Sequence, residues 1–259
     1  TRDPSKLTEM ANKGVDVRHG DFSDPASLDR AFKGIERLLV ISIDKLDVPG
    51  GRKAWQTAAV EAAERAGVGH LIYTSITNPY PSPTALVADD HFWTEAAITR
   101  TGGDWTLLRN NLYMDLLPMS AGRAIASGQL FHACGDGRRA LITRDDCAAV
   151  AAGALLTSTG KTVEDVSGPE TLSQGDLAAA FAAASGKPVT AVNVPVGGMI
   201  DGMVGAGIPK MLAQAFAAFD TDTARGVFSL TGDAVRRLAG REATTLKAFL
   251  SANPLSQPA

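Results

Sequence analysis

Tyrosine and histidine are the side chains in this sequence best suited to move a proton, and their neighbours restrict what they can do. A lysine four positions after a tyrosine lowers the pKa of the phenol, which can then exchange a proton with a hydroxyl or a carbonyl. At that position the three tyrosines are followed by threonine or leucine: Tyr73 by Thr77, Tyr80 by Thr84 and Tyr113 by Leu117. The sequence lacks this pair, which disfavours simple alcohol–ketone interconversion.

His91 is the polar residue that we single out for a catalytic role. It lies in the sequence HFWTE near the start of an expected helix, with Thr94 and Glu95 one helical turn further on. An imidazole there can orient or protonate a bound group, or it can simply cap or pack the helix. The other histidines are His19, His70 and His132. None of them has a possible catalytic partner at a characteristic spacing, so we interpret them as structural.

The overall composition excludes several classes of protein. Cys134 and Cys147 are the only cysteines, and no CxxC motif or Cys/His cluster indicates a disulfide framework or a metal site. Twenty-five basic and 28 acidic residues give a net charge of -3, without a basic stripe for nucleic acid. No apolar run approaches the roughly 18 residues of a membrane span. We expect a cytoplasmic protein without nucleic-acid or membrane partners.

Strand and helix patterns alternate over residues 1–110, an order typical of a parallel sheet covered by helices on both faces. The expected strands are GVDVRHGDF, RLLVIS, HLIYTS and DWTLLR. RLLVIS is a near-continuous apolar run, which predicts a central strand buried on both faces. Beyond Arg109 the alternation loosens, and residues 168–259 combine several helix patterns with one strand, VTAVNVP. These residues predict a smaller, α-rich lobe.

Several residues, most of them polar, lie at or just after the carboxyl ends of the expected strands, which is where open α/β sheets bind ligands. Amides and a phenol at such ends can orient a carboxamide or a quinone oxygen, whereas the alternatives are an ordinary turn and, for Tyr73, a place in the core. The residues concerned are Ser42 and Ile43, then Tyr73, Thr74 and Ser75, and finally Asn110, Asn111 and Tyr113.

As an ordered set, several segments resemble the NmrA-like branch of atypical short-chain dehydrogenases: TRDPSK, GVDVRHGDFSDPASLDRAFKGIERLLVIS, AAERAGVGHLIYTS, HFWTEAAI and TLLRNNLYMD. Within that branch the sequence is most similar to NADPH-dependent quinone oxidoreductases and triphenylmethane reductases. The resemblance implies an α/β fold with a Rossmann-like, doubly wound parallel sheet and a smaller α-rich substrate lobe. We expect the NAD(P)-binding domain at 1–111 and 140–167, and the substrate lobe at 112–139 and 168–259.

The resemblance also implies NADPH as the cofactor and gives roles to individual residues. Arg2 stands where the family places a basic residue on the 2′-phosphate of NADP, although it can also be an exposed arginine at a helix start. The other implied roles are adenine contacts for Asp21 and Phe22, ribose and nicotinamide contacts for Ser42, Ile43, Tyr73, Thr74, Ser75 and Asn110, and catalysis for His91 and Tyr113.

A glycine-rich phosphate loop is the family feature that we do not find in this sequence. Members of the family begin with a strand, this loop, a helix and a second strand that ends like Arg2-Asp3-Pro4, so we expect about thirty further residues before Thr1. A sheet without those strands would expose apolar edges, which favours a longer protein over a re-paired sheet. GAGIPK (205–210) imitates the loop without a preceding strand, and GDG (135–137) predicts a tight turn.

Two functions from different classes remain open. The first is an NADPH-dependent oxidoreductase that transfers hydride to a quinone or a similar conjugated electrophile, a small-molecule substrate that can take its proton later from water. The second is a non-catalytic, NADP-sensing regulatory protein of the NmrA type. A third possibility is that the chain as given binds no dinucleotide, and a homodimer is also left open.

Overall fold

Apolar and β-branched runs form the strands of this α/β protein, and alanine-rich segments form most of its helices. The computed structural model describes residues 1–45, 48, 50–82 and 85–255, and residues 256–259 of the expected lobe lie outside this part. Within the described part, the strands are β1 (Arg37–Val40), β2 (His70–Ile76), β3 (Asp104–Asn110), β4 (Gln129–His132), β5 (Lys161–Val166) and β6 (Thr190–Asn193).

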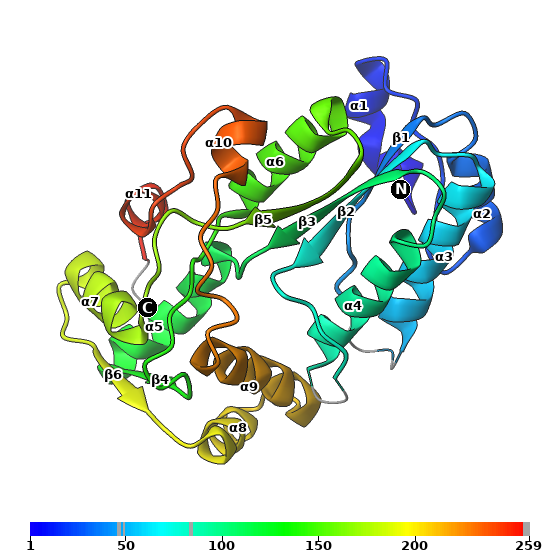
Figure 1. The fold of residues 1–259 in the computed structure, drawn as a ribbon. Helices are drawn as coiled ribbons and strands as arrows, with labels where there is room; N and C mark the ends of the chain where they lie inside the picture. Colours follow the sequence, from blue (N-terminus) through cyan, green and yellow to red (C-terminus); the bar gives the residue numbers. More distant parts are fainter. Residues whose placement is uncertain (46–47, 49, 83–84, 256–259) are drawn as a thin grey trace.

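Four of these strands form one parallel sheet in the order β1-β2-β3-β5 (Figure 1). All seven residues of β2 are buried, because the strand has a neighbour on each side and helices over both faces. The register places Ile76 beside Asn110, and Asn110 beside Val166. The carboxyl ends of neighbouring strands therefore meet at one edge of the sheet.

Helices cover both faces of this sheet, as the alternating pattern predicts (Figure 1). One apolar cluster joins α2, α3 and α4 to the sheet through residues such as Leu28, Ala59 and Ile98. A second cluster joins α6 and α10 to the other face through Val150 and Val235. The described helices are α1 (Thr8–Asn12), α2 (Pro25–Ala31), α3 (Gly51–Arg65), α4 (Leu86–Ile98), α5 (Leu117–Ser127), α6 (Arg144–Thr157), α7 (Gln174–Ser185), α8 (Val196–Gly205), α9 (Lys210–Ala224), α10 (Ala234–Ala239) and α11 (Leu246–Ala252), with short 3-10 turns at Pro4–Leu7 and Met114–Leu116.

Two expectations about the first strands are wrong for the described residues. RLLVIS forms β1, but β1 is an edge strand with only Val40 buried, because β2 is the one strand that pairs with it in the described part. GVDVRHGDF forms no regular strand, since a strand needs a neighbour along its length. Thr1 supplies one rung of a parallel ladder: its amino group donates to the Arg18 carbonyl at 3.1 Å and its carbonyl accepts from the Gly20 N–H at 2.9 Å.

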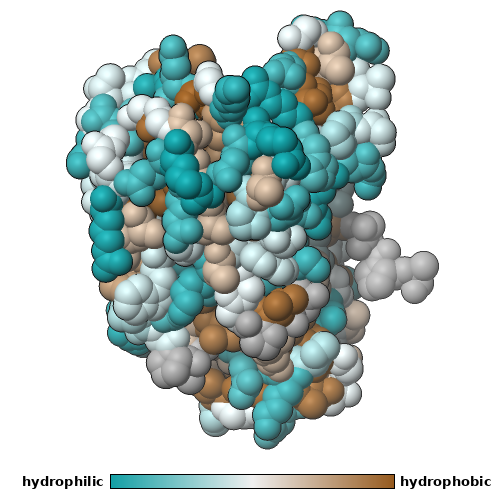
Figure 2. All heavy atoms as spheres, turned by 90° about the vertical axis from the view of Figure 1, so that its right-hand side faces the viewer, coloured by the Kyte–Doolittle hydropathy of each residue, from teal (hydrophilic) through white to brown (hydrophobic). Residues whose placement is uncertain are grey.

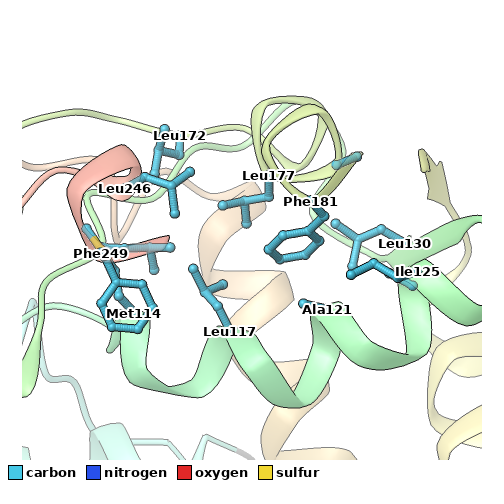
Figure 3. Close-up of a cluster of buried hydrophobic side chains, with 13 residues drawn as sticks. Met114, Leu117, Ala121, Ile125, Leu130, Leu172, Leu177, Phe181, Leu246 and Phe249 are labelled. Carbon is cyan, nitrogen blue, oxygen red and sulfur yellow. The ribbon is translucent and has the colours of Figure 1, made fainter. Parts of the chain in front are cut away.

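The smaller lobe has a core of its own. Phe181 and Leu177 of α7 point toward Leu117 and Ala121 of α5, and Phe249 of α11 closes one end of the cluster (Figure 3). The predicted strand VTAVNVP forms β6, which pairs in parallel with β4 in a separate two-stranded sheet. By contrast, α10 packs on α6 at the large sheet, although its sequence falls in the expected lobe.

The surface seen from the side of α2 and α3 is mainly hydrophilic, and its hydrophobic residues form separate small patches (Figure 2). None of the helices within the described ranges is long and apolar enough to cross a membrane.

Candidate functional site

The end of β1 is tied to the end of β2 by side-chain hydrogen bonds. The Ser42 N–H donates to Thr74 Oγ1 at 2.8 Å, and Thr74 Oγ1 donates to Ser42 Oγ at 3.2 Å. The Ser42 hydroxyl therefore keeps its own hydrogen for another acceptor. Ile41, just before it, is 63% exposed, so this segment presents an apolar side chain and a hydroxyl at the edge of the sheet.

The end of β3 carries a buried amide with an unused oxygen. Asn110 is 4% exposed, and its Nδ2 donates to the Tyr113 hydroxyl at 3.4 Å, but its Oδ1 accepts no hydrogen bond. A buried acceptor without a donor is costly, and such an atom at a strand end indicates a place for a ligand donor. Burial raises the pKa of Tyr113, whose ring lies under the Arg144 guanidinium at 5.3 Å.

The side chain of Asn111 has different hydrogen-bond partners from that of Asn110. Its Nδ2 donates to Ser167 Oγ and to the Phe228 carbonyl, both at 3.1 Å, and its Oδ1 accepts from the Leu112 N–H. All of the polar atoms of this amide are engaged within the protein. Asn111 thus joins the large sheet to the segment after α9.

Ser75 lies at the end of β2 beside a buried ion pair. Its hydroxyl donates to Glu95 Oε1 at 2.6 Å, while the Arg109 guanidinium donates to both oxygens of Glu95 at 3.1 and 2.7 Å. Such a two-point contact fixes both side chains. The Glu95 side chain is 8% exposed, so it serves here as a structural anchor between α4 and β3.

His91, the expected catalytic residue, is buried in a polar network beneath the strand ends. It is 4% exposed, its Nε2 lies 2.8 Å from Arg52 Nη2, and its Nδ1 lies 2.8 Å from the Tyr73 hydroxyl. The Gln56 amide donates to Tyr73 at 3.1 Å and to Thr94 Oγ1 at 3.0 Å. Both ring nitrogens of His91 therefore have protein partners.

The network fixes the protonation state of His91. A guanidinium only donates, so Nε2 accepts from Arg52 and the single ring proton sits on Nδ1, from which it is donated to Tyr73. Burial and the Arg52 charge hold the pKa of His91 well below its usual range. The catalytic role expected for His91 stays a prediction. Tyr73, which has no exposed surface and a pKa raised by burial, lies below the crevice surface.

Arg52 and Gln56 are residues of the site that our sequence interpretation missed. Arg52 Nε donates to the Ile43 carbonyl, and Gln56 Oε1 accepts the Ile43 N–H at 3.0 Å, so α3 holds both backbone groups of Ile43. Their spacing was an available signal: positions 52 and 56 continue the buried stripe of Ala59 and Ala63 with polar residues.

Arg2, Asp21 and Phe22 lie together at the amino-terminal end of the described chain. Arg2 is exposed, and Asp3 caps the turn that follows by accepting the Ser5 N–H at 3.1 Å. Hydrogen bonds from Ser23 hold the pKa of Asp21 below its usual range, with a smaller contribution from the Arg2 charge. Phe22 is half-buried against the α2–α3 cluster.

The segment that imitates a phosphate loop lies between two helices, and the second glycine segment is a turn. GAGIPK connects α8 to α9, and it follows a helix instead of a strand. GDG is a tight turn closed by the Gly137 N–H on the Cys134 carbonyl at 2.9 Å, as predicted.

A narrow apolar pocket adjoins the crevice where the lobe meets the sheet. Its cavity volume is only about 10 Å³, and it is lined by the end of β2, the start of α4 and the face of α9 that carries Ala215, Ala218 and Phe219. At its rim Asn78 has a left-handed backbone with φ 48°, and its Nδ2 donates to the Val227 carbonyl at 3.1 Å.

Metal ligands and disulfides are not features of the described residues. The part of the chain that the structure describes brings no three His, Cys, Asp or Glu side chains together in a group that could hold a metal ion. Cys134 and Cys147 are both buried and free.

Comparison with known proteins shows which relatives share this arrangement. The chain matches the NAD(P)H-binding family over residues 1–158. It is 34% identical over 252 residues to quinone oxidoreductase 2 of Escherichia coli, covering 96% of this chain and 86% of that protein. It is 29% identical to the NAD(P)H azoreductase of Xenophilus azovorans, covering 97% of this chain and 87% of the relative.

Solved structures agree with these matches. The E. coli NADPH-dependent quinone oxidoreductase complexed with NADPH superposes with a TM-score of 0.90 at 32% identity, over 97% of this chain and 88% of that one. The Citrobacter sp. triphenylmethane reductase complexed with NADP(H) gives a TM-score of 0.84 at 31% identity, with the same coverage. The transcriptional regulator NmrA, at 17% identity and a TM-score of 0.74, shares the fold.

A parallel sheet covered by helices on both faces, with polar residues at its strand ends, is the architecture of a dinucleotide-binding α/β protein of the Rossmann type, as in the solved relatives. The matched residues then give the family: this chain belongs to the NAD(P)H-binding family.

Proposed function

We propose that this protein is an NADPH-dependent oxidoreductase that reduces a quinone or a similar conjugated electrophile. The observation that carries the proposal is the buried amide at the end of β3, whose acceptor Asn110 Oδ1 is unused. In addition, no tyrosine of the sequence has a lysine four positions on. The full-length similarity to a quinone oxidoreductase and an azoreductase supports it. Conjugated acceptors suit such a site, because hydride transfer to them needs no strong acid.

The residues at the crevice fit a nicotinamide nucleotide. Asn110 Oδ1 lacks a donor, and the amide of a nicotinamide carboxamide is a donor of the right kind. The Ser42 hydroxyl, with its free hydrogen, suits a ribose oxygen, and the exposed Arg2 suits a 2′-phosphate. When bound, the nicotinamide supplies the hydride.

The protein's own residues position the reactants and exclude water. Thr74 and Ser75 fix the strand ends, Asp21 and Phe22 form the adenine side, and the Tyr113 hydroxyl is the polar group that orients an acceptor oxygen. Proximity then contributes most of the rate enhancement.

A direct assay tests the proposal. Purified protein with NADPH should oxidise the cofactor when a benzoquinone or naphthoquinone is added, and it should do so more slowly with NADH. Cofactor binding without quinone-dependent oxidation would instead indicate the NADP-sensing regulator. The likeness to NmrA, which concerns the fold alone, does not favour that alternative.

We also propose a cytoplasmic location, which is supported by two buried, unpaired cysteines. Subcellular fractionation tests it. Light scattering of the purified protein tests the homodimer that the sequence leaves open.

A further inference from the structure

The segment that follows β1 owes its position to side chains from other elements. β1 ends at Val40, and the backbone of residues 42 and 43 is held instead by Thr74 of β2 and by Arg52 and Gln56 of α3. The N–H groups of Ser42 and Ile43 are both used in these bonds. What remains for a ligand is the outward surface of this segment, with the exposed Ile41 and the Ser42 hydroxyl.

Arg52 connects this segment to α4. Its guanidinium donates to the Ile43 carbonyl, approaches Asp90 Oδ2 at 3.4 Å and reaches His91 Nε2 at 2.8 Å. The Arg52 side chain is 6% exposed and that of Asp90 13%. The planar guanidinium of Arg52 donates to three acceptors in two parts of the chain, which fixes its orientation more firmly than a lysine ammonium could.

Gln56 is oriented by the same network. Its two amide hydrogens go to Tyr73 and Thr94, so its Oε1 must face the Ile43 N–H. An inverted amide would set an NH₂ group against that N–H. Tyr73, Thr94 and His91 therefore determine how α3 presents Arg52 and Gln56 to the segment.

We propose that Arg52 and Gln56 are positioning residues that place Ser42 and Ile43 against the bound dinucleotide, and that His91 acts only through Arg52 and Tyr73. This inference rests on the proposed function, since it takes that segment to be part of the cofactor site. It gives the buried network a role in cofactor affinity and none in proton transfer to the acceptor.

Variants of Arg52 test the inference in the full protein. Arg52→Met keeps the length and the apolar stem but removes the fork, so the Kd for NADPH should rise by more than about tenfold. The quinone KM and kcat at saturating NADPH should stay within about twofold. Arg52→Lys, which can still donate one hydrogen bond, should recover part of the affinity. A merely structural role would lower thermal stability without this split.

Arg65→Met is the matched control, because Arg65 is on the same helix and pairs with Asp29 at an exposed site. Arg65→Met should change none of the three constants, which are the Kd for NADPH, the quinone KM and kcat. If Arg52→Met fails to fold, Gln56→Met replaces it with the same expected rise in Kd. Wild-type NADPH affinity in a folded Arg52→Met or Gln56→Met protein would overturn the inference alone, whereas a wild type that binds no NADPH would overturn the proposed function as well.

Discussion

Arg2 is the residue whose role depends most on the choice of cofactor. Its exposed guanidinium has no counterpart charge on NADH, but it can bind the 2′-phosphate of NADPH. Arg2→Ala should therefore weaken NADPH binding by about 1.5–3 kcal/mol, or more than tenfold, and leave NADH binding nearly unchanged. Calorimetric titration of both cofactors measures this. Arg30→Ala, at an exposed site on α2, is the control, and equal losses for both cofactors would show that Arg2 only begins the first turn.

A second prediction at the residue scale concerns His91 and the pH dependence of folding stability. Its pKa is lowered in the folded protein by burial and by Arg52, whereas an unfolded histidine titrates near 6.5. Below that pH the unfolded state binds a proton that the folded state does not, so stability falls on acidification, by up to about 1.4 kcal/mol per pH unit. His91→Gln should remove this part of the dependence.

Urea unfolding at pH 7.5 and 5.5 measures the effect. The exposed His19 provides the matched control, and His19→Gln should keep the wild-type dependence. An unchanged pH dependence in His91→Gln would mean that His91 is protonated in the folded protein. The tautomer derived for the network would then be wrong.

At the scale of elements, close packing between two helices determines where α10 lies on the sheet. α10 crosses α6 so closely that a Cβ on Gly153 would lie 1.9 Å from the Leu238 carbonyl oxygen. Glycine is required there by the approach of another backbone, although the position is helical. This contact attaches α10 to the sheet face and keeps it out of the lobe core.

Gly153→Ala should therefore destabilise the protein by about 1–3 kcal/mol, because α10 must move away from α6. Gly122→Ala is the control: Gly122 is inside α5 with no atom within 4 Å of a new Cβ, so the change should stabilise by about 0.5–1 kcal/mol. Thermal unfolding of both variants gives the comparison. Equal effects would show that the α6–α10 approach is not a constraint.

At the scale of the whole molecule, hydrophobic periodicity predicted the type of each element better than it predicted which elements lie beside one another. The alternation of strands and helices predicted a parallel sheet with helices on both faces, and the structure confirms it. The sequence did not show that β6 would pair with β4, or that α10 would pack against α6 and not within the lobe. Such contacts join residues far apart in the chain, and no local pattern encodes them.

The same limit applies to the site. Strand ends could be located from apolar runs, so Ser42, Thr74 and Asn110 could be predicted as residues at the strand ends. The burial of His91 was not visible, because a polar residue on a helix has the same local pattern whether it faces water or another polar side chain. Arg52 was missed for that reason: its partners come from α4 and from the end of β1.

Polar contacts around the apolar pocket join α9 and the segment after it to the segment after β2, and Tyr80 makes one of them. Its hydroxyl donates to Asp222 Oδ1 of α9 at 2.7 Å, and burial with this carboxylate raises the pKa of Tyr80 to about 12, so the donor persists at neutral pH.

Tyr80→Phe leaves the buried Asp222 with one donor fewer, which should cost about 1–3 kcal/mol. Amide hydrogen exchange in α9 should accelerate while exchange in β2 stays unchanged, because the lobe loosens before the sheet opens. Thr221→Val, which alters an exposed hydroxyl on the same helix, should leave α9 as protected as in the wild type. Wild-type exchange in α9 of Tyr80→Phe would show that apolar packing alone holds the lobe against the sheet.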